Sequence, residues 1–218
     1  MRDRYSIAVG LLFLAVIAIA FFHTIGAGGP RTLGLEKLPP RWPLPEFAVP
    51  AASGSLEGDA NIAQDDCESG QLPCPAGSRR TPACRIHVAG AIRVCDLFDR
   101  PLVISFWFTK GGNCAEQQNA VEKAYERYRG RVSFLSLDVG DERSTVRELV
   151  RKHRWSMPVG YDRDGAVGDL YGVGGCPTFA FAYPGGTMQG ASAGNMTTGQ
   201  LEGRVRGLLR ATRAAEAG

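Results

Sequence analysis

The placement of two cysteines, Cys114 and Cys176, constrains this chain more than any other feature. Cys114 closes residues 106–114 (FWFTKGGNC), where an apolar strand is expected to end and a helix to begin. Cys176 closes a glycine-rich turn and precedes Pro177, directly before the apolar residues 178–182. Both sulfurs therefore stand beside predicted regular structure, in connecting segments of the kind that commonly carry function.

Residues 1–25 are expected to form an N-terminal transmembrane signal anchor. Residues 7–22 (IAVGLLFLAVIAIAFF) are continuously apolar, and with their flanks they reach roughly 20 residues, about 30 Å as a helix, which spans a bilayer. Arg2 and Arg4 precede the run, so the positive-inside rule places the N-terminus in the cytoplasm and the rest outside. The alternative is a cleaved signal peptide, although residues 23–27 (HTIGA) make a poor cleavage site. We therefore expect a single-pass protein of the cell membrane, held by residues 7–25, with an extracytoplasmic C-terminal domain.

The chain has 6 cysteines, and disulfides persist outside the cytoplasm. Residues 84–95 (CRIHVAGAIRVC) alternate in polarity and are predicted to form a hairpin with a turn at Ala89-Gly90. Positions 84 and 95 would face each other, which favours a Cys84–Cys95 disulfide among the three possible pairings and leaves Cys67 with Cys74. The spacing lacks the close cysteine pairs of structural zinc sites, so no metal is expected.

The rest of the chain is divided as follows. Residues 26–43 form a Pro/Gly-rich linker, residues 44–212 a folded domain that includes a disulfide-rich loop and hairpin insertion at 51–95, and residues 213–218 a C-terminal tail. Hydrophobic periodicity predicts strands at 101–108, 132–139, 159–164, 178–182 and 187–192, and helices at 114–129, 142–153, 166–171 and after Thr197 or Thr198. This order predicts an α/β sandwich with a mixed central sheet flanked by helices.

Other classes of function find little support. A formal charge of +3 over 218 residues gives no argument for nucleic acid, and the glycine-rich runs match no phosphate-binding pattern. None of the three histidines is near Cys114 in sequence, and His153 is interpreted as a charge at a helix C-terminus. No cofactor is expected.

Several segments, in the right order, resemble the thioredoxin superfamily. They are residues 45–50 (PEFAVP), an opening strand, Phe106-Trp107 with Thr109, the lead into an active-site helix, and residues 171–179 (YGVGGCPTF), a cis-proline loop. The chain resembles most the membrane-anchored, TlpA-like redoxins, which are thiol–disulfide oxidoreductases, over about residues 44–212. The resemblance implies a thioredoxin-like sandwich with a substrate groove formed by Trp107, Thr109, Lys110, Gly111, Gly112, Asn113 and Pro177.

The active-site motif is altered to Gly-x-x-Cys. Gly111 stands where the family has its first cysteine, and Ser105 stands where some thioredoxins bury an acid. Asn113 and Glu116 form a capping-box-like pattern that would place Cys114 in the first helical turn, where a thiolate is favoured, and Lys110 would add to this effect. The family fold would bring Cys176 close to Cys114 as a catalytic pair; a permanent structural disulfide and two unpaired thiols are the alternatives.

The function implied by the resemblance is thiol–disulfide exchange with exported cysteine-containing proteins or a membrane electron donor. A non-catalytic binding or assembly module with structural disulfides is the first alternative. Peroxide or small-thiol reduction by a lone Cys114 is the second.

Overall fold

The computed structural model describes residues 41–56, 62–63, 82–85, 87–110 and 114–217. The predicted anchor, residues 26–40 of the predicted linker, the proposed Cys67–Cys74 pair and residues 111–113 lie outside this part of the chain. The last three linker residues, 41–43, are described, and Pro43 forms a β-bridge with Thr187. Within it, no helix combines the length and apolarity that crossing a bilayer requires.

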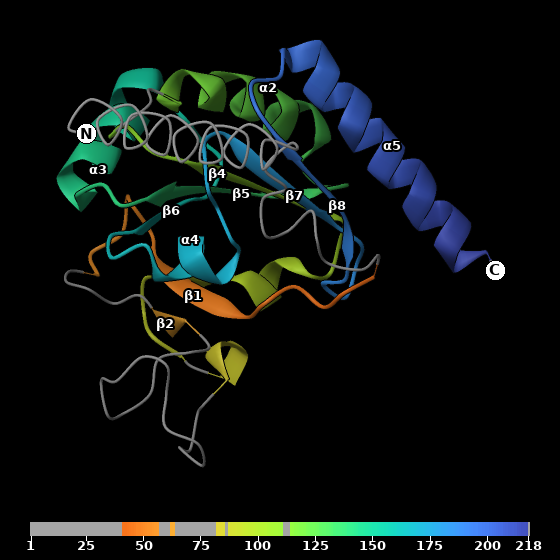
Figure 1. Cartoon of the computed structure of the whole chain (residues 1–218), viewed down its shortest axis with the longest axis horizontal. Helices are drawn as coiled ribbons and strands as arrows, with labels where there is room; N and C mark the ends of the chain where they lie inside the picture. Colours follow the sequence, from red (N-terminus) through yellow and green to blue (C-terminus); the bar gives the residue numbers. More distant parts are fainter. Residues whose placement is uncertain (1–40, 57–61, 64–81, 86, 111–113, 218) are drawn as a thin grey trace, which may run out of the picture. The chain divides into compact units, whose positions relative to one another are not determined.

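A five-stranded mixed sheet forms the centre of the domain, as predicted. Its strand order is β6-β5-β4-β7-β8 (Figure 1). Strands β6, β5 and β4 run parallel, whereas β7 is antiparallel to β4 and β8 is antiparallel to β7. The strands are β4 (Leu102–Trp107), β5 (Ser133–Val139), β6 (Val159–Asp162), β7 (Thr178–Ala182) and β8 (Met188–Ala193).

Helices cover both faces of this sheet, which makes the sandwich. Figure 1 shows α2 (Gln118–Tyr128) and α3 (Arg143–His153) on one side and α4 (Ala166–Leu170) with β1 on the other. Side chains of β4 alternate between two cores, because successive residues of a strand point to opposite faces. Val103 and Trp107 belong to the core under α2 and α5 (Thr198–Glu216), whereas Ile104 and Phe106 belong to the core under β1 and α4.

The predicted helix at 114–129 has a different beginning. Residues Ala115–Gln117 form a 3₁₀ turn (η4), and the α-helix starts at Gln118. The last helix is α5, which follows a capping box made by Thr197 and Gln200. It continues to Glu216, past the expected start of the tail at residue 213.

The predicted hairpin at 84–95 is wrong. Residues Ala83–Arg85 and Val94–Leu97 form 3₁₀ turns (η2 and η3), and β3 (Ala91–Arg93) pairs instead with β1 (Phe47–Pro50). With β2 (Ile62–Ala63) they make a separate three-stranded sheet in the order β2-β1-β3. The turn at Ala89-Gly90 is present, with Gly90 at φ +86°, a conformation that glycine adopts without steric cost. The Cys84–Cys95 disulfide does form, and it joins the two 3₁₀ turns. The Cα atoms of the two cysteines are 5.7 Å apart.

Candidate functional site

Cys114 and Cys176 are joined in a disulfide, with their Cα atoms 5.9 Å apart. The sheet brings them together, because β4 and β7 are antiparallel neighbours with Phe106 opposite Thr178. The chain leaving β4 and the chain entering β7 therefore meet at one edge of the sheet. The peptide bond between Cys176 and Pro177 is cis. Two cysteines remote in sequence thus form one dithiol or disulfide unit.

The two sulfur-bearing residues differ in accessibility. Cys114 is 8% exposed and belongs to the core under α2, whereas Cys176 is half-buried and packs against that core from outside. The carbonyl oxygen of Phe108 accepts a hydrogen bond from the Cys114 N–H at 3.3 Å and lies 3.8 Å from Cys176 Sγ. Cys114 is therefore the inner member of the pair and Cys176 the outer one.

An aspartate holds the end of β4 in place. The backbone N–H and the hydroxyl of Thr109 each donate to the Asp141 carboxylate at 2.7 Å. Lys110 donates to the carbonyl of Gly140 at 3.0 Å, so its observed hydrogen bond is to the β5–α3 loop. These contacts fix the segment that leads to Cys114.

A neutral hydrogen-bond chain lies beneath the site. Trp107 Nε1 donates to Ser136 Oγ at 2.8 Å, and Ser136 donates to Gln118 Oε1 at 2.9 Å. Gln118 Nε2 then donates to Ser105 Oγ at 3.0 Å. All four side chains are buried. Ser105, which was expected to replace a buried acid of some thioredoxins, thus accepts a hydrogen bond within this chain.

Trp107 was expected in the substrate groove, and the structure corrects this. Its side chain is 0% exposed, so it supports the site from below and cannot contact a substrate. Pro177 is also buried, so its side chain is not exposed at the surface beside Cys176.

The predicted cap of the active-site helix also differs. Cys114 occupies the N-cap position of η4 without a side-chain cap. The Glu116 carboxylate accepts from Asn119 Nδ2 at 2.9 Å and lies 3.8 Å from His153 Nε2. His153 lies in the last turn of α3, the position that the sequence predicted. Its proximity to Glu116 of η4 was not predicted. The pattern of the sequence does not show this pairing.

Gln117 is a second contribution that the sequence does not indicate. It is buried, donates to the carbonyl of Met196 at 2.8 Å and accepts from the Met196 N–H at 2.9 Å. This pair of bonds ties the segment before α5 to the turn that follows Cys114.

Three buried aspartates surround the loop after β5. Burial, and then the neighbouring Asp141, raise the pKa of Asp138 to about 9. Burial also raises the pKa of Asp162 to about 7, against the hydrogen bond that it accepts from the Gly168 N–H at 2.7 Å. Asp138 stands beside Trp107 in the parallel register of β4 and β5, so a carboxyl that is neutral at pH 7 adjoins the buried hydrogen-bond chain.

Comparison with known proteins shows which family the chain resembles. Residues 83–189 match the model of the AhpC/TSA family. The chain is therefore similar to the AhpC/TSA-type, thioredoxin-like redoxins. The chain is 26% identical over 113 residues to the thiol-disulfide oxidoreductase ResA of Oceanobacillus iheyensis, a match that covers 51% of the chain and 59% of that relative. It is 24% identical over 111 residues to ResA of Bacillus subtilis, over 50% of the chain and 62% of the relative.

Solved structures show the same fold. The chain is similar to a putative thiol:disulfide interchange protein DsbE from Chlorobium tepidum, with a TM-score of 0.57 and 16% identity over 79% of this chain and 99% of that one. It is also similar to a putative thioredoxin from Neisseria meningitidis, with a TM-score of 0.51 and 24% identity over 58% and 87%. At these identities the similarity establishes the thioredoxin-like fold.

Proposed function

We propose that this protein is a membrane-anchored, extracytoplasmic thiol–disulfide oxidoreductase whose active pair is Cys114 and Cys176. The observation that carries the proposal is their disulfide, which lies where β4 ends and β7 begins. The name of the ResA relatives supports the same activity. The sulfur missing at Gly111 is replaced by one from the loop on the other side of the site.

Accessibility assigns the two sulfurs different steps. In the reduced protein, the Cys176 thiolate attacks a substrate disulfide, forms a mixed disulfide and releases one substrate thiolate. The Cys114 thiolate then attacks Cys176 Sγ, breaks the mixed disulfide and releases the second substrate thiolate. The substrate gains two electrons and, after protonation, two protons, and the protein ends as the disulfide. Exchange with an external dithiol restores the two thiols, and the reverse sequence oxidises a substrate.

The location and partners belong to the same proposal. Residues 7–25 anchor the chain, with the N-terminus in the cytoplasm and the redoxin domain outside, where exported cysteine-containing proteins and membrane electron donors are available. Export fits the cysteine content, because disulfides persist outside the cytoplasm. Protease digestion of intact and permeabilised cells tests the topology: the domain is digested in both if it lies outside.

Disulfide reduction by the purified full chain in detergent tests the activity. We expect the wild type to reduce a fluorescent mixed-disulfide substrate with a dithiol as electron source, and Cys114→Ser and Cys176→Ser each to lose turnover. An inert wild type with a correctly formed disulfide would favour the second candidate, a binding module in which Cys114–Cys176 is only structural. The low exposure of Cys114 is the observation that favours this second candidate. Chemistry at a lone Cys114 loses its basis, because that sulfur is bonded to Cys176.

A further inference from the structure

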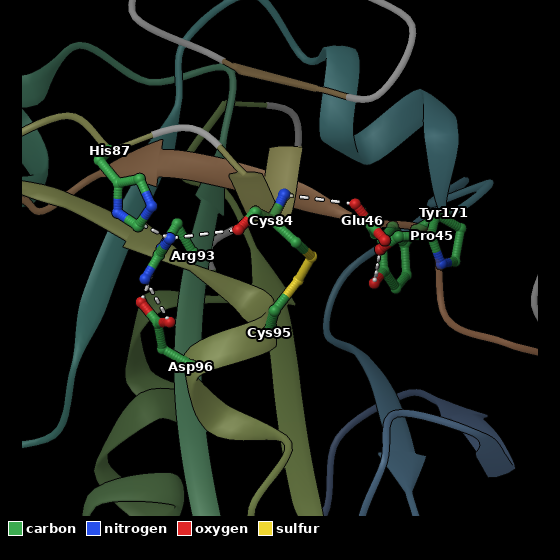
Figure 2. The surroundings of a disulfide bond; sticks show 8 residues. All are labelled: Pro45, Glu46, Cys84, His87, Arg93, Cys95, Asp96 and Tyr171. Carbon is green, nitrogen blue, oxygen red and sulfur yellow. Dashed lines mark hydrogen bonds and ion pairs between the residues drawn. A yellow bond between two sulfur atoms is a disulfide. The ribbon is translucent and has the colours of Figure 1, made fainter. Parts of the chain in front are cut away.

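A second sulfur site lies away from the Cys114–Cys176 pair. Cys84 and Cys95 come from the turns η2 and η3, and Glu46 directly precedes β1. One ligand atom from each of these three residues, the two sulfurs and a carboxylate oxygen, lies within 4.8 Å of the others. Figure 2 shows the carboxylate of Glu46 facing the Cys84 backbone beside the disulfide. Three side chains from separate parts of the chain therefore converge on one point.

The Glu46 carboxylate makes one hydrogen bond and no ion pair among the described residues. It is half-buried, and its Oε2 accepts one hydrogen bond, from the Cys84 N–H at 3.2 Å. No basic side chain in the described part of the chain makes an ion pair with it. A carboxylate next to two cysteine sulfurs, with no described basic side chain paired to it, resembles an incomplete set of metal ligands.

Arg93 is the nearby cation, and its hydrogen bonds are to other groups. Its guanidinium donates to both Asp96 carboxylate oxygens, at 2.9 and 2.7 Å, and to the Cys84 carbonyl at 3.1 Å. It also lies 3.1 Å from His87 Nδ1. Arg93 thus contacts the backbone of Cys84 and not the proposed ligand atoms. From this position its positive charge would offset the negative charge of the ligands.

We propose that Glu46, Cys84 and Cys95 form a Zn²⁺ site when the Cys84–Cys95 disulfide is reduced. An external dithiol breaks the S–S bond, supplies two electrons and two protons, and is itself oxidised to a disulfide. Zn²⁺ then displaces the two thiol protons and binds two thiolates and the carboxylate. Three protein ligands leave the fourth tetrahedral position to water. The metal-bound state and the disulfide state exclude each other, because both use the same sulfur atoms.

The ligand chemistry selects zinc. Zn²⁺ bonds to sulfur at about 2.3 Å and to carboxylate oxygen at about 2.0–2.2 Å, so tetrahedral ligand atoms are separated by roughly 3.6–3.8 Å. Ligand atoms within 4.8 Å of one another reach that spacing after small side-chain rotations once the sulfurs are no longer bonded. Ca²⁺ and Mg²⁺ require oxygen ligands, and Cu(I) prefers sulfur alone, whereas Zn²⁺ accepts the mixed set.

The test uses the full chain in detergent. The chain is reduced with a phosphine, and the phosphine is then removed under anaerobic conditions. Co²⁺ is the spectroscopic probe, and Zn²⁺ affinity is measured by competition with a chromophoric chelator. We expect one Co²⁺ per chain with thiolate charge-transfer absorption that Zn²⁺ abolishes, and no such site in the oxidised chain. Cys114→Ser/Cys176→Ser and Cys67→Ser/Cys74→Ser should each keep the site, which separates it from the other thiols and from the exchange activity.

Two further variants make the test specific. Cys84→Ser/Cys95→Ser should abolish the site, and Glu46→Gln, which keeps both sulfurs, should weaken Zn²⁺ binding about tenfold or more. Asp99→Asn is the matched control, because Asp99 is an exposed carboxylate paired with Arg100 beyond η3, and it should leave the affinity unchanged. Bound Zn²⁺ should also slow alkylation of Cys84 and Cys95. The proposal is overturned if the reduced chain binds no Co²⁺, if binding follows another cysteine pair, or if Glu46→Gln binds Zn²⁺ as tightly as Asp99→Asn.

Discussion

Thr109 donates twice to the carboxylate of Asp141, once from its backbone and once from its hydroxyl, both at 2.7 Å. This relationship joins the end of β4 to the loop after β5. Cys114 lies five residues after Thr109, so the carboxylate fixes the start of the segment that leads to the inner sulfur.

We predict that Thr109→Val destabilises the protein by ~1.5–3 kcal/mol, since a hydrogen bond to a charged group contributes about that much. Urea unfolding of the oxidised chain measures the change. Thr109→Ser is the matched control, because it retains the hydroxyl and should cost far less. Equal loss in the two variants would show that the hydroxyl bond contributes nothing.

The two cysteines are predicted to behave differently when one is removed. In Cys114→Ser, the outer thiol Cys176 remains and should accumulate a mixed disulfide with a labelled substrate. In Cys176→Ser, the remaining Cys114 is 8% exposed and should trap the same substrate much more slowly. Mass spectrometry of quenched samples gives both rates, and faster trapping at Cys114 would reverse the assigned order of attack.

Gln118 connects the two serines of the buried chain. We predict that Gln118→Leu costs ~1–3 kcal/mol, because it leaves buried hydroxyls without partners. Adding Ser105→Ala to Gln118→Leu should recover part of the lost stability, because it removes one of the buried hydroxyls that has no partner. Urea unfolding monitored by tryptophan fluorescence measures both steps, and a double variant less stable than Gln118→Leu alone would contradict the explanation.

Asp138 should make stability fall as the pH rises. Its pKa is raised from 3.8 to about 9 in the folded protein, so between these values the folded state holds a proton that the unfolded state has released. The neutral carboxyl contributes fully to the free energy of unfolding below about pH 4. This contribution is lost as the pH rises toward 9, by up to ~1.4 kcal/mol per pH unit.

Comparison with Asp138→Asn isolates this effect, because asparagine is close in shape and does not titrate. The wild type should lose stability relative to the variant between pH 5 and pH 8. The charge of Asp162 is one of the causes that raise the pKa of Asp138, so both proteins should also carry Asp162→Asn, which removes the titration of Asp162 near pH 7. Parallel pH profiles would show that Asp138 is ionised in the folded protein.

Removing the second disulfide should affect stability but not exchange. Cys84→Ala/Cys95→Ala opens a short loop, and we expect a loss of about 3 kcal/mol in the chain-entropy estimate. The rate of disulfide reduction at Cys114–Cys176 should be unchanged under conditions where the variant is folded. A large loss of rate in the folded variant would mean that the two pairs act together.

The order of strands and helices was predictable because each element carries its own local pattern. Residues 102–107 form a short run that is apolar except for Ser105, as a strand buried on both faces requires. The final helix has both its apolar face and its capping box in local sequence. The approach of Cys114 to Cys176 was accessible only through the family resemblance. Local patterns do not determine which strands become neighbours.

The wrong prediction at residues 84–95 and the contacts that were missed have the same cause: both depend on pairing between distant segments. Residues 84–95 have the alternation of a hairpin, yet the ladder partner of β3 is β1, more than forty positions away. The contacts of Gln118, of Gln117 with Met196, and of Glu46 with Cys84 also join distant segments. Polar side chains of this kind have no periodic signal, and only the folded chain shows that they are buried or convergent.

The central claim is that the Cys114–Cys176 disulfide exchanges electrons rather than only bracing the fold. Its reduction potential is the most direct test, measured on the full chain equilibrated in glutathione or dithiothreitol buffers and quantified by differential alkylation of the two cysteines. We predict a value between about −120 and −270 mV, the range of exchange enzymes. A value below about −300 mV, typical of structural disulfides in secreted proteins, would contradict the proposed function.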